Sequence, residues 1–246
     1  FSWNDLTVEL SELKQVFDLC LSCKACASEC PSNVDVAALK AEFLYQYQET
    51  NGYSFRSKLF ANNVKYNKLG SITPALTNIL LNTSVAKGIM GVAQQRSVPK
   101  LASKTFRKWY TNQTKNTSNK KVYLFNDEFT NYYDVEIGKD AIIVLEKLGY
   151  EIVVLNHKES GRSFISKGVL KEAKQVCNQN IALFKDVISK ETPLIGIEPS
   201  AILTFRDEYI RLADDKKAAQ KLSKNCFTIE EFLFQEFENG NINSEL

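Results

Sequence analysis

Four cysteines within eleven residues are the most specific chemical feature of the sequence. The spacing C-x2-C-x2-C-x3-C-P is formed by Cys20, Cys23, Cys26, Cys30 and Pro31. Such a loop wraps one iron–sulfur cubane, so that thiolates reach the irons while backbone N–H groups turn toward the cluster sulfurs. The sequence therefore predicts a [4Fe–4S] cluster held by these four cysteines, and a role in electron transfer.

Zinc is the chemical alternative for this loop. Zinc sites usually pair two C-x2-C knuckles across a longer insert. Three cysteines at consecutive x2 spacing, followed by Cys-Pro, fit an iron–sulfur cluster better. The alternative is a zinc-stabilised interaction module without a catalytic role, and metal analysis separates the two.

The last cysteine of the run, Cys30, decides how many ligands the first cluster has within this sequence. In ferredoxins with two clusters, the fourth cysteine of this pattern ligates the other cluster. The first cluster then needs a remote Cys-Pro pair, and the sequence has no second one. Cys177 and Cys226 stand alone in predicted helical surroundings and are interpreted as ordinary half-buried cysteines. We therefore expect the missing ligands in a twin motif upstream of Phe1, which makes the chain a fragment.

Composition excludes some classes of function. The chain has 246 residues, 44% of them hydrophobic and 24% charged, with a net charge of +2. A nucleic-acid-binding domain is usually far more basic, so no nucleic-acid partner is expected. No apolar run approaches the ~20 residues that span a bilayer, so no transmembrane segment is expected. The clustered cysteines indicate a reducing cytoplasm.

The chain is predicted to have two parts. Residues 1–110 are expected to form a helical domain, with helices at 34–44, 55–66 and 74–81. Residues 111–121 contain no apolar side chain and are the predicted linker. Cations near this linker are interpreted as a solvated surface, with a membrane surface or an acidic partner as alternatives: Lys100, Lys104, Arg107, Lys108, Lys115, Lys120 and Lys121.

Residues 122–246 alternate between strand and helix patterns. The predicted strands are 122–125, 151–155 and 193–197, and the predicted helices are 133–148, 166–189 and one that begins at Pro199. This order indicates a three-layer α/β domain with a mainly parallel sheet.

Several stretches together resemble one family. They are CLSCKACASECPSNVDVAALKAEF, KWY, LFNDEFTNYYDVEIG, ESGRSFISKGVL and GIEPSAILTFRDEY. They are similar to the C-terminal iron–sulfur half of the fused FAD-linked oxidases, which act on D-2-hydroxyacids such as D-lactate, glycolate or 2-hydroxyglutarate. The resemblance covers nearly the whole chain. It implies a ferredoxin-like [4Fe–4S] domain followed by a domain of the cysteine-rich type.

The resemblance also implies a mechanism. An FAD domain upstream of Phe1, or a flavoprotein subunit, would take a hydride from the hydroxyacid. Electrons would then leave through the clusters to an acceptor such as a quinone. The chain is thus expected to be the electron-transfer part of an oxidoreductase, without the substrate site, in the cytoplasm or at the inner face of the membrane. A free-standing electron-transfer subunit of a multi-subunit reductase is the alternative.

The α/β domain departs from the family pattern. Where relatives often have a Cys-Cys pair before a glycine, and a cysteine after Pro-Ser, this chain has Glu159-Ser160-Gly161 and Pro199-Ser200-Ala201. Carboxylates and hydroxyls do not replace soft thiolates as iron–sulfur ligands. We therefore expect this domain to resemble a cysteine-rich domain that has lost its cluster ligands.

Polar residues at predicted strand ends have two interpretations. They are Asn126, Asp127, Glu128, Glu159, Ser160, Gly161, Arg162, Glu198, Arg206, Asp207 and Glu208. One interpretation is a degenerate cofactor pocket or a surface that grips a neighbouring domain. The other, which we favour, is loop capping and salt bridges. The single histidine, His157, is expected to be an ordinary polar loop residue.

Overall fold

The computed structural model describes residues 7–114 and 116–242. It divides into two compact units. The first unit combines the residues up to Asn62 with Ser163–Ala173, and the second combines Asn63–Arg162 with the residues from Lys174 onward. The predicted linker at 111–121 does not coincide with either boundary and stays a prediction of domain organisation.

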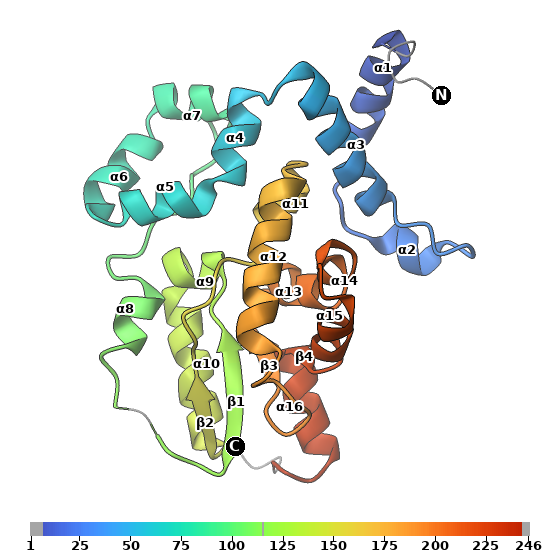
Figure 1. Cartoon of the computed structure of the whole chain (residues 1–246). Coiled ribbons are helices and arrows are strands. Elements are labelled where there is room, and N and C mark those ends of the chain that lie inside the picture. The colour runs from blue at the N-terminus through green and yellow to red at the C-terminus, as the bar shows by residue number, and fades with distance from the viewer. Residues whose placement is uncertain (1–6, 115, 243–246) are drawn as a thin grey trace. The chain divides into compact units, whose positions relative to one another are not determined.

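The first unit is helical. It contains α1 (Thr7–Asp18), α2 (Ala25–Glu29), α3 (Val36–Asn51) and α4 (Phe55–Ala61), shown in blue in Figure 1. The helix predicted from residue 34 is present as α3, and Asp35 caps it by accepting a hydrogen bond from the Ala38 N–H at 2.9 Å. Phe17 of α1 packs against Phe43 of α3, with ring centroids 5.1 Å apart.

A distant segment completes this unit. Gln48 of α3 donates a hydrogen bond to the Lys167 carbonyl at 2.7 Å. Gly168 has a φ of +66°, which glycine adopts without steric cost. The helix predicted over 166–189 is present in a shorter form, as α12 (Leu170–Phe184), and this glycine separates it from α11 (Arg162–Ser166).

The second unit begins with short helices. They are α5 (Asn63–Gly70), α6 (Pro74–Leu81), α7 (Ser84–Met90) and α8 (Phe106–Tyr110). The predicted helix at 74–81 is confirmed, with Pro74 in its first turn. The predicted helix at 55–66 is instead two helices, α4 and α5, divided at Asn62.

Among the described residues, no helix combines the length and the apolar character needed to cross a bilayer.

A four-stranded parallel sheet forms the centre of the second unit. Its strands lie in the order β2 (Tyr150–Val153), β1 (Lys120–Phe125), β3 (Leu194–Gly196) and β4 (Cys226–Thr228). The mainly parallel sheet is confirmed. The predicted helical surroundings of Cys226 are wrong, because this residue lies in β4, a three-residue strand too short to show a periodic pattern.

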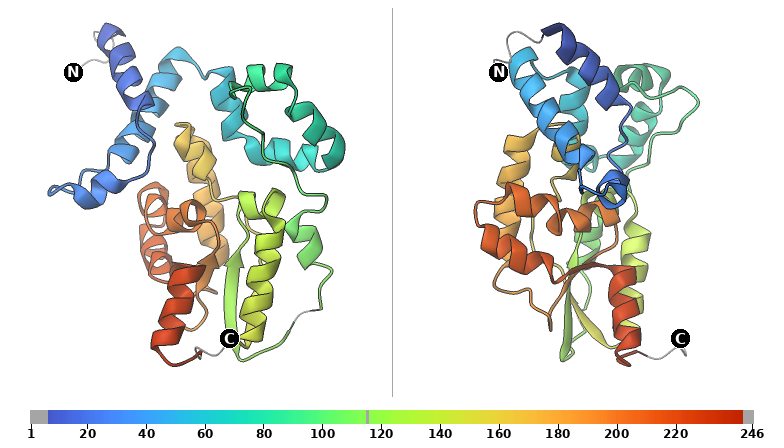
Figure 2. Two further views of the ribbon diagram at one scale, coloured as in Figure 1. Left: turned by 180° about the vertical axis from the view of Figure 1, so that it is seen from behind. Right: turned by 90° about the vertical axis from the view of Figure 1, so that its right-hand side faces the viewer.

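Helices cover both faces of the sheet (Figure 2, right). Along β1, Val122 and Leu124 point into a core with α10 (Val135–Lys147) and α16 (Ile229–Glu238). Phe125 points into the opposite core, with α12 and the helices α13 (Pro199–Ile202), α14 (Glu208–Leu212) and α15 (Lys216–Ser223). The domain is thus a three-layer α/β structure, as expected from the strand–helix alternation.

Candidate functional site

The cysteine run forms the connection between α1 and α3. Cys20 and Cys23 precede the short helix α2, Cys26 lies in it, and Cys30 follows it directly. Ser22 and Lys24 have φ values of +55° and +64°, an uncommon conformation for residues other than glycine. Ser22 lies between the first and second cysteines and Lys24 between the second and third. These two left-handed residues turn the backbone tightly.

Backbone N–H groups of this loop point at the sulfur atoms. The Ser22 N–H donates to Cys20 Sγ at 3.4 Å, and the Val36 N–H at the start of α3 donates to Cys26 Sγ at 3.3 Å. The N–H groups of Val34, Ser32 and Asn33 lower the pKa of Cys30. Such contacts favour the thiolate, which is the form that binds a metal.

The four thiols of the loop are accessible, and they are not gathered around one point. All are free; Cys23 is exposed and the other three are partly buried. Within residues 7–114 and 116–242, no three His, Cys, Asp or Glu side chains are grouped as a metal-binding set. The donor type and the N–H contacts fit an iron–sulfur cluster. The loop therefore supplies ligands of the type that such a cluster needs.

The other two cysteines belong to the core. Cys177 and Cys226 are fully buried, rather than half-buried as predicted. Burial raises the pKa of Cys177 to about 12 and also raises the pKa of Cys226. Each thiol points at a backbone carbonyl, of Tyr209 and Leu222 respectively. These cysteines fill space as small apolar residues.

In the α/β domain, Glu128 and Ser160 form a buried pair. The Ser160 N–H and hydroxyl donate to the two carboxylate oxygens of Glu128 at 3.0 and 2.7 Å. Burial raises the pKa of Glu128 to about 7, although both hydrogen bonds lower it. Tyr209 donates to the Ser160 carbonyl at 2.9 Å, and Asn180 donates to the Tyr209 hydroxyl at 2.9 Å.

The sequence pattern indicates Glu128 and Ser160 separately, but it does not indicate their partners Asn180 and Tyr209. Asn180 lies on the buried side of α12 and is 0% exposed, which a single amide in a mixed helix pattern does not reveal. The four residues together connect the loop after β2 to α9 (Glu128–Tyr132), to α12 and to α14. The network gives each buried polar group a partner.

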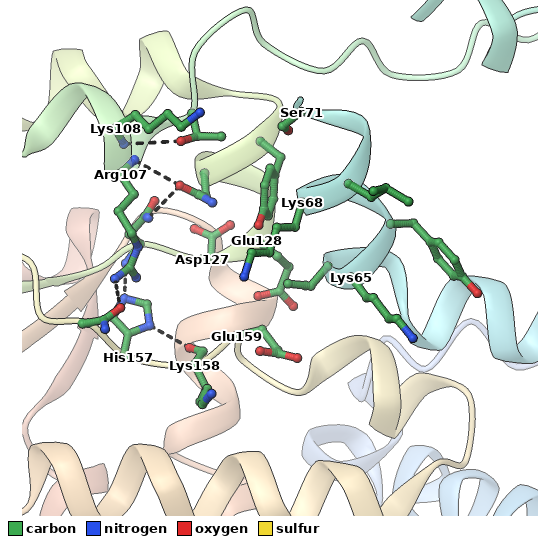
Figure 3. A pocket seen from close by; sticks show the side chains of 18 of the residues that line it. Lys65, Lys68, Ser71, Arg107, Lys108, Asp127, Glu128, His157, Lys158 and Glu159 are labelled. Atoms are coloured by element: carbon green, nitrogen blue, oxygen red, sulfur yellow. Dashed lines mark hydrogen bonds between the residues drawn. The ribbon is translucent and has the colours of Figure 1, made fainter. Parts of the chain in front are cut away.

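A cavity of about 740 Å³ opens beside this network (Figure 3). Its wall includes cations from α5 and α8, the end of β1 and the loop after β2. The charged or polar lining residues are Lys65, Tyr66, Lys68, Ser71, Thr105, Arg107, Lys108, Asn126, Asp127, Glu128, Asn131, Tyr132, Asn156, His157, Lys158 and Glu159. Arg107 donates to Asn156 at 2.6 Å, and burial lowers its pKa.

Two groups in this wall are fully engaged by the protein. Asp127 accepts hydrogen bonds from the Phe129 and Thr130 N–H groups at 2.8 and 2.9 Å, and so caps α9. His157 lies in the loop after β2, as predicted, but it is buried there and stacks on Phe125, with ring centroids 4.3 Å apart. These contacts hold the loops in place, which leaves neither side chain available as a proton carrier.

Four other strand-end residues, Arg162, Glu198, Arg206 and Glu208, form caps and ion pairs. Arg162 pairs with Glu208, and Arg206 donates to both oxygens of Glu231 at 2.8 and 2.6 Å. Glu198 caps α13 by accepting from the Ser200 N–H at 3.2 Å. For these residues the favoured interpretation, loop capping and salt bridges, is confirmed.

Comparison with known proteins adds named relatives. A D-2-hydroxyglutarate dehydrogenase of Haemophilus influenzae is 26% identical over 96% of this chain, and one of Escherichia coli is 27% identical over 80%. One subunit of the anaerobic glycerol-3-phosphate dehydrogenase of Escherichia coli is 28% identical over 48% of the chain and 31% of that subunit. The chain spans about a quarter (24% and 21%) of the length of the two D-2-hydroxyglutarate dehydrogenases. No family model and no solved structure matches it.

Proposed function

We propose that this chain, which belongs to the family of the D-2-hydroxyglutarate dehydrogenases and their relatives, is the iron–sulfur electron-transfer portion of an oxidoreductase that oxidises a D-2-hydroxyacid. The observation that carries the proposal is the cysteine loop with its N–H groups directed at sulfur. It lies in a chain that aligns over almost its full length with dehydrogenases.

The loop would supply [4Fe–4S] ligands through Cys20, Cys23, Cys26 and Cys30, in a ferredoxin-like helical domain. When bound, the cluster supplies one-electron transfer. The chain's own contribution is to provide thiolates, N–H donors and cations such as Lys24, which lies 3.9 Å from Asp35 beside the loop. These groups stabilise negative charge on the sulfurs and so tune the potential.

A second cysteine motif would complete the ligand set. The proposal follows the ferredoxin rule that Cys30 serves another cluster. It is supported by apolar side chains that stand in solvent around the loop, of which Leu21 is 90% and Leu19 is 82% exposed. Exposed apolar surface of this kind marks a place where another protein segment packs.

The electron donor would be an FAD domain of a longer chain, or a separate flavoprotein subunit. The acceptor would be a quinone or a similar carrier, and the site of action the reducing cytoplasm at the inner face of the membrane. The α/β domain would bind no cluster. This is supported by Ser160, whose hydroxyl and N–H are both directed at Glu128.

The similarity to one subunit of a glycerol-3-phosphate dehydrogenase favours a second candidate. In that case the protein is a free-standing electron-transfer subunit, with the same cysteine ligands and a separate flavoprotein partner. The position of the gene's start codon separates this from the fused arrangement.

The test is metal and sulfide analysis of the chain purified without oxygen, together with EPR after dithionite reduction. We expect iron and sulfide in equal amounts and a reduced-cluster signal. Cys23→Ser should remove both, whereas the matched control Cys177→Ala should retain them, because Cys177 lies in the core. Zinc without sulfide would overturn the proposal in favour of a zinc-stabilised interaction module.

A further inference from the structure

Helices α5, α6 and α7 carry an unusual amount of exposed aliphatic surface. Seven side chains, which we call the α5–α7 apolar face, are 54–74% exposed: Leu69, Ile72, Leu76, Ile79, Leu80, Val85 and Ile89. On α6 they recur at spacings of three and four residues, and on α7 at four, so each helix presents them on one side. A soluble domain rarely leaves so many clustered aliphatic residues without a partner.

The charges of the sequence segment that carries this face have a single sign. Residues 50–126 contain no aspartate or glutamate. The same stretch supplies cations that are partly or fully exposed in the second unit, namely Lys65, Lys68, Lys87, Arg96, Lys100, Lys104, Arg107 and Lys108. Lys115, one of the cations noted near the predicted linker, lies outside the described residues. A partner complementary to this segment is therefore anionic and also accepts aliphatic side chains.

The residue types favour lipid over protein. Protein interfaces are enriched in aromatic residues, methionine and arginine at their centres and depleted in lysine. The α5–α7 apolar face has the opposite character, with leucine, isoleucine and valine bordered largely by lysine. Aliphatic side chains enter the boundary between headgroups and acyl chains, and lysines bind anionic headgroups.

We propose that the α5–α7 apolar face docks on the surface of a bilayer that contains anionic phospholipid. The inference rests on the proposed function in one respect: an electron acceptor dissolved in the membrane would be reached from the membrane surface. It does not depend on the identity of the metal in the cysteine loop. The helices lie on the bilayer, and the cations set the preference for negative lipid.

Flotation of the whole chain with vesicles tests this. One set consists of phosphatidylcholine alone, and the other contains about one-third phosphatidylglycerol. We expect the chain to float with the anionic vesicles only, and less so as salt rises. Ile72→Glu with Ile79→Glu should lower the apparent affinity about tenfold or more, because both side chains must leave water. Lys100→Gln with Lys104→Gln should weaken binding to anionic vesicles.

The matched control is Ile137→Glu. Ile137 is also 54% exposed but belongs to α10 and not to the α5–α7 apolar face, so this variant should float like the parent chain. Thermal unfolding of each variant checks that the fold is retained. Absence of vesicle binding would overturn the proposal, as would a dimer in light scattering that becomes monomeric in the glutamate variants. Iron and sulfide content should not change in these variants, so a failure here is distinct from a failure of the cluster assignment.

Discussion

Ser160 donates two hydrogen bonds to the carboxylate of Glu128, from its N–H at 3.0 Å and from its hydroxyl at 2.7 Å. The two residues are 32 positions apart and join the loop after β2 to the first turn of α9. Glu128 is only 3% exposed, so its charge is desolvated and depends on these two donors. This pair makes the stability of the α/β domain depend on pH.

Because burial raises the folded-state pKa of Glu128 from 4.5 to about 7, the folded state holds this proton more tightly than the unfolded chain does. The free energy of unfolding should therefore fall as pH rises from about 4.5 through about 7, by up to about 3 kcal/mol. Glu128→Gln should flatten this dependence. Urea unfolding of both proteins at about pH 5 and about pH 8 measures the difference.

The control for this prediction is Glu159→Gln, which removes a neighbouring carboxylate that also lines the cavity. It should leave the slope of stability against pH largely unchanged. Equal slopes in the parent chain and in Glu128→Gln would show that Glu128 is ionised throughout this range.

His157 should remain neutral far below the usual range. Burial lowers its pKa to about 4. Its Nε2 accepts from the Asn126 N–H at 3.1 Å, and its Nδ1 lies 2.7 Å from the Lys158 carbonyl, so the proton is on Nδ1. The stability that depends on the neutral ring is present above about pH 6.5 and is lost as pH falls toward about 4.

Since His157 is the only histidine in the chain, its imidazole NMR signals need no assignment by mutation. We expect the Nδ1–H tautomer at neutral pH and no titration down to about pH 5. A midpoint near 6.5 would contradict the buried stacked position beside Phe125.

Gly168 should tolerate no side chain. A Cβ there would lie 2.6 Å from Leu44 Cβ and 2.8 Å from the Tyr45 N atom, and the φ of +66° is already unfavourable for alanine. Gly168→Ala should therefore lower the free energy of unfolding by roughly 2–5 kcal/mol. Gly52→Ala is the control, since Gly52 also has a positive φ, +81°, but its Cβ would meet nothing within 4 Å. Denaturation followed by circular dichroism compares the two, and equal losses would rule out the close approach of α3.

Gly168 shows why the local sequence pattern identifies a helix better than it identifies a break in helical structure. The sequence pattern predicted helical structure over 166–189, but one left-handed residue separates α11 from α12, and Leu44, far away in the chain, lies against that residue. The same holds for β4, because Cys226–Thr228 becomes a strand only by pairing with β3. Strands with longer apolar runs, such as β1, were predictable.

The candidate sites differ in the same way. The four cysteines of the loop are readable from spacing alone, because the loop is contiguous. The pairing of Glu128 with Ser160, and its support by Asn180, arises only when the sheet brings β1 and β2 together. The sequence indicated both as polar residues at predicted strand ends, but no periodicity rule connects positions 32 residues apart.

The cap of α3 should connect helix stability to the cysteine loop. Asp35 accepts a hydrogen bond from the Ala38 N–H, and the next residue, Val36, donates its own N–H to Cys26 Sγ. Asp35→Ala should cost about 1 kcal/mol of stability, because it removes the cap. With the first turn of α3 loosened, the chain reconstituted with iron and sulfide should also lose iron faster than the parent chain.

Asp35→Asn keeps a capping side chain and should behave like the parent in both measurements. Faster iron loss in Asp35→Asn as well would assign the effect to the carboxylate charge beside Lys24 instead of the cap. Unchanged iron loss in Asp35→Ala, despite the lower stability, would show that the Val36 N–H is not needed to retain the metal.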